Sequence, residues 1–237
     1  SRQRHVDEVM NQVISNNYDG IDLDYEAIYL EDKEKFFDLL EKFSLELAKN
    51  NKKFVFTVLP KWGDDVFYNS LPQTRLVQDY KRIADLTDEF RIMTYEFSAR
   101  DGVQVGPIAP LDWMEDTIRY ALLEGVPREK LVLGIHTYSY DYLKRPIDGE
   151  IEYYPVFDPK GTDKKPQAAA YFPKNIESLN FETTEFNEEW GELIGIYKDD
   201  ENNERVVIYP TQRSIDLRKQ LAADYGLKGV VYWRVGA

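Results

Sequence analysis

Acidic and apolar residues alternate strictly from Ile21 to Glu26, within a stretch that carries four carboxylates in eight residues. This two-residue period is typical of a β-strand. On such a strand Asp22, Asp24 and Glu26 share one face, and the apolar residues share the other. Three like charges held close together and partly out of water raise the pKa of at least one carboxyl group. A carboxylic acid that stays protonated near neutral pH can donate a proton.

The rest of the chain decides whether this acidic face is solvated or enclosed. Helical and extended patterns alternate along it, which predicts parallel β/α units. Strands of that class are covered on both faces, so the acids are expected to point into a barrel or cleft rather than into water. The predicted elements are helix 1–17, strand 18–26, helix 31–50, strand 54–59, helix 73–85, strand 90–95, a helix from about 112 to 125, strand 131–136, helix 211–225 and strand 229–233.

Residues 138–210 interrupt this alternation with loops rich in Pro, Gly and Lys. Within them, the apolar runs 193–197 and 206–209 flank the polar run 199–203, a pattern that predicts a β-hairpin. We interpret the segment as a small α+β insertion. The predicted organisation is therefore barrel units in 1–137, the insertion in 138–210, and a last helix and strand in 211–237.

Composition narrows the class of protein. The 237 residues are 43% hydrophobic, enough for one sizeable core or two small ones. The formal net charge is −13 and no basic run is present, which argues against nucleic acid or an anionic membrane as partner. Cysteine is absent, so the chain has no disulfide, Cys-based metal site or catalytic thiol. No apolar run reaches membrane-spanning length, and no cofactor is expected.

The acidic stretch also resembles a known family. Residues 19–26, Asp-Gly-Ile-Asp-Leu-Asp-Tyr-Glu, are similar to the D-G-x-D-x-D-x-E signature of glycoside hydrolase family 18, the chitinases and related N-acetylglucosaminidases. Residues 93–96 resemble the M-x-Y-D motif of barrel strand six, residues 133–138 resemble strand seven and residues 229–233 resemble strand eight. Residues 106–113 and 232–236 are similar to the bacterial spore-cortex and cell-wall branch. The resemblance implies a TIM (β/α)8 barrel, and it covers nearly the whole chain.

The family's mechanism assigns a role to each matching residue. In substrate-assisted hydrolysis the 2-acetamido oxygen of the sugar attacks its own anomeric carbon, so no enzyme nucleophile is needed. The resemblance then implies that Glu26 protonates the leaving oxygen and later activates water. Asp24 would orient the acetamide and stabilise the oxazolinium cation, Asp22 would hold Asp24, Tyr95 would hydrogen-bond the acetamide oxygen, and Trp233 would stack beneath the sugar.

Other positions are expected to support substrate binding or packing. The resemblance places Met93, Glu96 and Tyr138 with Trp233 in the substrate-binding set, and Trp62 is a further candidate. Trp113 begins a predicted helix and is expected to pack. Two positions depart from the family pattern: Glu96 stands where Asp is usual, and His136 stands where Pro is common.

The resemblance implies a polysaccharide that contains N-acetylglucosamine as partner, and an extracellular, cell-wall or spore-associated location for the full-length protein. Chitin, peptidoglycan and N-glycan remain open as substrates, as do endo and exo action. One alternative function is a non-catalytic chitinase-like lectin, although such proteins usually lose the acid that Glu26 provides here. A second is a Mg²⁺ enzyme that uses the three acids as oxygen ligands, but no phosphate-binding loop or second acidic cluster accompanies them.

The strand count carries a last expectation. Five barrel strands are predicted, equivalent to strands four to eight, and residues 1–17 supply none of the first three. A five-stranded arc cannot close, and it leaves strand edges open to pair with another molecule. We therefore expect the chain to be the C-terminal part of a longer barrel, or to self-associate through an open edge. An arc standing alone is expected to show little or no hydrolysis.

Overall fold

The computed structural model describes residues 1–63, 73–98, 106–147, 150–155, 169–171, 176 and 178–234. Part of the predicted insertion lies outside the described residues. The chain forms two compact units. The first contains Ser1–Met93, Asp116–Leu133 and Ala222–Val231, and the second contains Thr94–Glu115, Gly134–Leu221 and Tyr232–Ala237.

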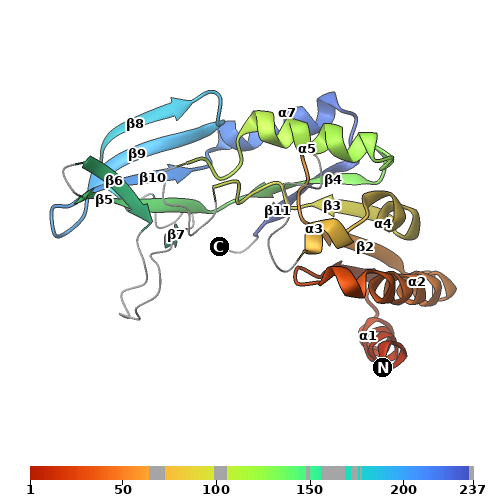
Figure 1. Cartoon of the computed structure of the whole chain (residues 1–237). Helices are drawn as coiled ribbons and strands as arrows, with labels where there is room; N and C mark the ends of the chain where they lie inside the picture. The colour runs from red at the N-terminus through yellow and green to blue at the C-terminus, as the bar shows by residue number, and fades with distance from the viewer. Residues whose placement is uncertain are drawn as a thin grey trace. The chain divides into compact units, whose positions relative to one another are not determined.

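The first unit is built on a parallel sheet with strand order β1-β2-β3-β4-β11, whose last two strands continue into the second unit. The predicted alternation of helices and strands is confirmed (Figure 1). The elements are α1 (Arg2–Ser15), β1 (Gly20–Asp24), η1 (Leu30–Asp32), α2 (Lys33–Lys49), β2 (Lys53–Val58), α3 (Thr74–Val77), α4 (Tyr80–Leu86), β3 (Glu89–Ile92), α5 (Leu111–Leu123), β4 (Leu131–His136), α7 (Gln212–Asp224) and β11 (Gly229–Trp233).

One face of this sheet is apolar and covered. Phe54, Phe56 and Val58 alternate along β2 with partly exposed residues, and each is at most 2% exposed. Helix α2 supplies the covering side chains, and the rings of Phe36 and Phe56 meet edge to face at 5.7 Å. Burial of large aromatic side chains stabilises this arrangement. The opposite face carries the acids of β1 with Thr57 and Arg91, together with Val55 and Val132.

Two predicted strands end earlier than expected, and one predicted helix is divided. The acidic strand ends at Asp24 rather than at 26, and the strand predicted at 90–95 ends at Ile92. The helix predicted at 73–85 is two helices, α3 and α4. It is divided because Gln78 leaves the helical conformation, and because Asp79 starts a new helix by accepting a hydrogen bond from the Arg82 amide at 3.0 Å.

The described part of the second unit contains an antiparallel sheet. Its strand order is β6-β5-β10-β9-β8, and β7 pairs with β5. The predicted hairpin is confirmed, with β9 and β10 in antiparallel register around residues 199–203. The remaining division into 1–137, 138–210 and 211–237 stays a prediction. The strands are β5 (Ser139–Ile147), β6 (Glu150–Pro155), β7 (Ala169–Tyr171), β8 (Phe181–Asn187), β9 (Glu192–Lys198) and β10 (Glu204–Tyr209).

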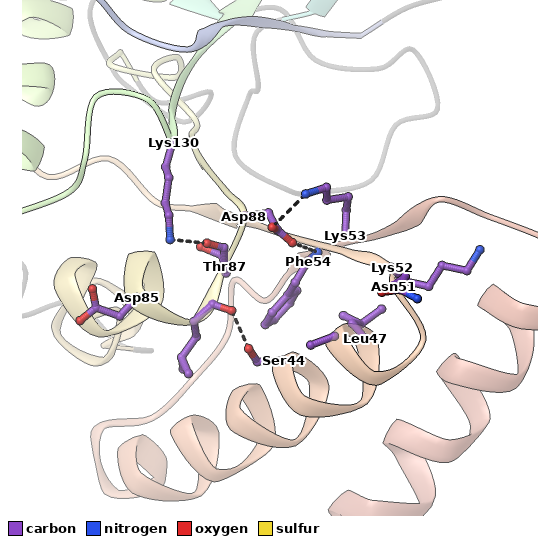
Figure 2. A pocket seen from close by; sticks show the side chains of 12 residues that line it. Ser44, Leu47, Asn51, Lys52, Lys53, Phe54, Asp85, Thr87, Asp88 and Lys130 are labelled. Carbon is purple, nitrogen blue, oxygen red and sulfur yellow. Dashed lines mark hydrogen bonds and ion pairs between the residues drawn. The ribbon is translucent and has the colours of Figure 1, made fainter.

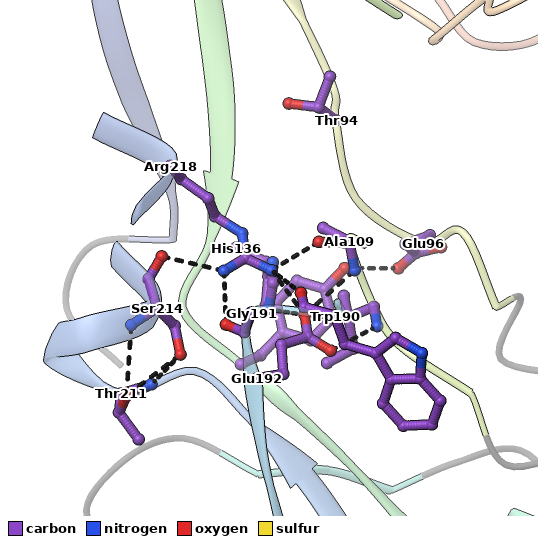
Figure 3. Close-up of polar contacts among 12 residues, drawn as sticks. Thr94, Glu96, Ala109, His136, Trp190, Gly191, Glu192, Thr211, Ser214 and Arg218 are labelled. Atoms are coloured by element: carbon purple, nitrogen blue, oxygen red, sulfur yellow. Dashed lines mark hydrogen bonds and ion pairs between the residues drawn. The ribbon is translucent and has the colours of Figure 1, made fainter. Parts of the chain in front are cut away.

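The second unit contains a fully buried carboxylate, Glu192 (Figure 3). Glu192 accepts hydrogen bonds from the amides of Ile108 and Ala109 at 3.0 and 3.1 Å and from the Arg218 guanidinium at 3.0 Å, and His136 Nε2 lies 3.0 Å away. Burial alone would raise the pKa of Glu192, but these neighbours together lower it. His136, the departure from the family pattern, is thus part of a buried polar cluster.

Gly20 allows β1 and β2 to approach each other closely at their first residues. A Cβ atom at Gly20 would lie 2.1 Å from the carbonyl oxygen of Lys53, a backbone atom. The Lys53 amide also donates to the Asp19 carbonyl at 2.8 Å, so neither strand can move away without losing this bond. The close approach of the two strands therefore requires glycine at this position of the acidic motif, independently of any catalytic role.

We predict that Gly20→Ala destabilises the fold by about 1–3 kcal/mol, because the added methyl group forces the two strands apart. Gly229→Ala is the matched control: it also lies in a strand of this sheet, but nothing lies within 4 Å of its added Cβ. Urea unfolding of both variants measures the difference. Equal stability of the two variants would contradict the steric explanation.

Candidate active site

The acidic side chains of β1 lie on the polar face of the sheet. The strand register pairs Asp24 with Thr57 and Thr57 with Arg91, so these three residues occupy neighbouring positions on one face. Asp22 accepts a hydrogen bond from Thr57 Oγ1 at 2.9 Å and forms an ion pair with Arg91 Nη1 at 2.8 Å. Both carboxylate oxygens of Asp22 are therefore bound by donors.

The environment of Asp24 differs from that of Asp22 and favours the protonated form. Its pKa is raised to about 6, first by burial, then by the nearby Glu26 carboxylate and a hydrogen bond with it, and last by the charge of Asp22. The sequence-based prediction that at least one of the acids has a raised pKa is confirmed for Asp24. Two neighbouring ionised carboxylates repel, so Glu26 adds to the effect of burial on Asp24.

Glu26 itself lies two residues beyond the end of β1. Its carbonyl oxygen accepts a hydrogen bond from Thr74 Oγ1 at 2.9 Å. The carboxyl ends of parallel strands are where β/α-barrel proteins place their active sites. Asp22, Asp24 and Glu26 thus follow one another toward that end, as the sequence predicted.

A groove of about 550 Å³ opens beside these acids. Helix α1 contributes His5, whose Nε2 lies 2.7 Å from the Tyr25 hydroxyl. The groove combines acidic, basic and apolar side chains, and its lining includes Arg2, His5, Asp24, Tyr25, Glu26, Ile28, Lys35, Phe36 and Leu39.

Arg91 was not identified from the sequence. It pairs with Asp22 and also with Glu89 on its own strand at 2.6 Å, and Glu89 in turn contacts Lys228 at 3.2 Å. The available signal was the alternation of Glu89 and Arg91 around the buried Phe90, which marks both charges as residues of the polar face. Which acid Arg91 would meet depends on strand register, and that was not readable from the sequence.

The second unit brings together three of the predicted site residues: Tyr95 of the catalytic set, and Glu96 and Tyr138 of the substrate-binding set. The rings of Tyr95 and Tyr138 meet edge to face at 6.3 Å, and the Tyr138 hydroxyl donates to Glu96 Oε1 at 3.3 Å. Glu96 adopts a positive φ of 63°. Burial raises the pKa of Tyr138 far above its ordinary value, so this hydroxyl remains a donor.

The tryptophans and Met93 differ in their exposure. Trp233, at the end of β11, is 53% exposed, which leaves a ring face available to a ligand. Trp62 is 38% exposed, with the Arg75 guanidinium 5.8 Å from its ring. Trp113 is buried, as its predicted packing role requires, and Met93 in the first unit is also buried.

A second cavity, of about 450 Å³, lies at the amino ends of β2 and β3 (Figure 2). Its polar groups serve the fold: Lys130 Nζ donates to the carbonyls of Ala84 and Thr87 at 2.7 Å, and Ser44 Oγ donates to the Leu86 carbonyl at 2.8 Å. In β/α barrels this end of the strands contributes stability rather than chemistry. We therefore assign the candidate active site to the carboxyl end.

In the part of the chain that the structure describes, no group of three or more His, Cys, Asp or Glu side chains is arranged to hold a metal ion. Among the same residues, no helix is both long and apolar enough to cross a bilayer.

A parallel β/α sheet with carboxylates at the carboxyl end of its first strand is the arrangement expected of a TIM-barrel-type protein. The family model of the glycosyl hydrolases family 18 matches residues 1–237, so the chain belongs to this family. It is 24% identical over 238 residues to the uncharacterized glycosylase YvbX of Bacillus subtilis, covering 100% of this chain and 62% of that protein. It is also 24% identical over 239 residues to the cortical fragment-lytic enzyme of B. subtilis, covering 99% and 50%.

A solved structure shares the fold. The spore cortex-lytic enzyme SleL of Bacillus megaterium superposes with a TM-score of 0.81 at 22% identity, covering 99% of this chain and 50% of that one. The chain thus spans between 50% and 62% of the length of these three relatives.

We predict that Asp24→Asn stabilises the fold at pH 7.5 and raises Tm by about 2–4 °C. The folded-state pKa of Asp24 is raised from 3.8 to about 6, so its stabilising contribution is complete below pH 4 and is lost as the pH rises through 6. The uncharged amide avoids this loss, and the difference in Tm should vanish near pH 4.

Asp22→Asn is the control for this prediction, because it removes a carboxylate that is paired with Arg91 rather than repelled. It should lower Tm at pH 7.5. Thermal melts of both variants at the two pH values measure the effect, and a stabilisation of equal size at pH 4 and 7.5 would contradict the protonation argument.

Proposed function

We propose that the protein is a glycosidase that cleaves β-1,4-linked polymers containing N-acetylglucosamine, of the chitin or peptidoglycan type. The observation that carries the proposal is the Asp24–Glu26 pair at the carboxyl end of a barrel strand, where burial and the neighbouring Glu26 carboxylate raise the pKa of Asp24. Membership of family 18 supports the same conclusion. No cofactor is needed for this reaction.

The proposed mechanism is substrate-assisted and retains the anomeric configuration. Glu26 donates a proton to the leaving oxygen while the 2-acetamido oxygen of the substrate attacks the anomeric carbon. Asp24 orients the acetamide and, as it loses its proton, stabilises the positive charge of the oxazolinium intermediate. A pKa of about 6 suits this exchange, because Asp24 then changes its charge near neutral pH.

The remaining roles follow the family resemblance. Tyr95 is proposed to hydrogen-bond the acetamide oxygen, and Trp233 to stack beneath the sugar, for which its exposed ring is suited. Met93, Glu96 and Tyr138 are proposed as further substrate-binding residues.

We also propose that β1, β2, β3, β4 and β11 are the fourth to eighth strands of the barrel. The family motif on β1 and the order of the sheet support this assignment. Asp22 is proposed to act through its charge, since Thr57 and Arg91 occupy its two oxygens.

The substrate class can be narrowed by direct digestion. Relatives carry names that include both cortical fragment-lytic enzyme and probable chitinase, so both polymers are suitable probes. Incubating the full-length protein with chito-oligosaccharides and with muropeptides, and reading the products by mass spectrometry, identifies the preferred class. Binding of either polymer without any cleavage would favour the lectin alternative.

We predict that Glu26→Gln lowers turnover of the full-length protein by at least about 100-fold while sugar binding survives. The substitution removes proton donation but little volume. Glu31→Gln is the matched control, since Glu31 is an exposed acid five residues further along, and it should keep normal turnover. Steady-state kinetics and calorimetric titration with chito-oligosaccharide give both quantities. Normal turnover by folded Glu26→Gln would exclude Glu26 as the acid.

A further prediction concerns the substrate itself. Analogues that lack the 2-acetamido group should not be cleaved, and thiazoline analogues of N-acetylglucosamine should inhibit, because the acetamide supplies the nucleophile. Nuclear magnetic resonance of the first product should show the β configuration. A covalent glycosyl-enzyme trapped on any carboxylate would contradict the mechanism.

A further inference from the structure

The hydrogen-bond ladder between β1 and β2 ends where a side chain takes its place. The last paired residues are Asp24 and Thr57. Beyond them, Gln78 lies between the strands: its Nε2 donates to the Tyr25 carbonyl at 3.3 Å, and its Oε1 accepts from the Leu59 amide at 2.8 Å. Gln78 is completely buried, so both backbone groups depend on it rather than on water.

Thr74, one helical turn before Gln78, holds the next part of the same segment. Its hydroxyl donates to the Glu26 carbonyl at 2.9 Å and accepts from the Ile28 amide at 2.9 Å. The side chain is 1% exposed. A single hydroxyl therefore spans the backbone on both sides of Ala27, immediately after the proposed acid.

The turn that carries these two side chains is itself fixed to the end of β2. Arg75 Nε donates to the Pro60 carbonyl at 2.9 Å, and the Tyr80 hydroxyl donates to the Leu59 carbonyl at 2.6 Å. Tyr80 is fully buried. Residues 74–80 thus connect the backbone that follows β1 to the backbone that follows β2.

From these contacts we infer that Thr74 and Gln78 are positioning residues for catalysis, which set the place of the Glu26 backbone relative to Asp24. The inference rests on the proposed role of Glu26. Asp24 is fixed by the strand ladder, whereas Glu26 lies outside it, so the distance between the two carboxyl groups depends on what holds residues 25–28. The structure assigns that task to two uncharged, buried side chains far away in the sequence.

The expected effect is on turnover rather than on substrate affinity. A displacement of about 1 Å at a catalytic group can reduce rate by about 100-fold. Neither residue lines the groove beside the acids, so the ground-state binding of sugar should change little. Loss of either side chain should therefore lower kcat and leave KM nearly unchanged.

The test compares three threonine variants of the full-length protein. Thr74→Val keeps the shape of the side chain and removes the hydroxyl, whereas Thr74→Ser keeps the hydroxyl. Thr87→Val is the control: it removes another buried hydroxyl, which donates to the Ile83 carbonyl at 2.9 Å at the end of α4. We expect Thr74→Val to lose about 10-fold or more in kcat with unchanged KM. Thr74→Ser and Thr87→Val should retain most of the turnover.

Hydrogen exchange supplies a readout that does not require activity. Thr74→Val removes the acceptor of the Ile28 amide, so exchange at Ile28 should become at least about 10-fold faster, with no such change in Thr87→Val. Gln78→Met should likewise make hydrogen exchange at the Leu59 amide faster, and it should also lower kcat. This second variant keeps the inference testable if one variant fails to fold.

Glu26→Gln is measured in the same assay. If it is inactive while Thr74→Val and Gln78→Met turn over normally, the positioning role is wrong and the proposed function stands. Equal loss of kcat in Thr74→Val and Thr87→Val also overturns the inference, because it indicates a general loss of stability. If Glu26→Gln is active, the proposed function itself fails.

Discussion

Burial of the phenylalanines of β2 and β3 under helices fixes the direction of every side chain on the neighbouring strand. Phe54, Phe56 and Phe90 are at most 2% exposed, and strand register is set by this apolar face. A shift of β1 by one residue would place Leu23 on the polar face and the acids among the aromatic rings. The position of the carboxylates is thus a consequence of core packing, before any chemistry is considered.

On that polar face two aspartates of one strand have different environments. Asp22 is bound by a guanidinium and a hydroxyl, whereas Asp24 faces another carboxylate. The same residue type can therefore serve as a fixed anion at one position and as a proton carrier two residues later. The pairing of Asp22 comes from β2 and β3, which supply Thr57 and Arg91, whereas the raised pKa of Asp24 comes from burial and from the acids of its own segment.

Local patterns in the sequence predicted the order of the elements, the acidic face, the raised carboxyl pKa and the hairpin of β9 and β10. Local patterns did not predict features that depend on a residue far away in the sequence, such as the end of a strand or the partner of a charge. The acidic strand was predicted to end two residues too late because Gln78, more than fifty positions away, takes the place of the ladder. Arg91 and Thr74 were missed for the same reason, since neither carries a local signal of which backbone or acid it meets.

The buried cluster around Glu192 bears on how separable the segment 138–210 is. Glu192 lies within that segment, but Arg218, His136 and the amides of Ile108 and Ala109, which it binds, lie outside it. Removing one member of a buried ionic cluster leaves an uncompensated charge. The segment therefore cannot be exchanged independently of the rest of the chain. A chimera that takes this segment from a homologue must also take the residues that pair with its buried carboxylate, or a buried charge is left without a partner.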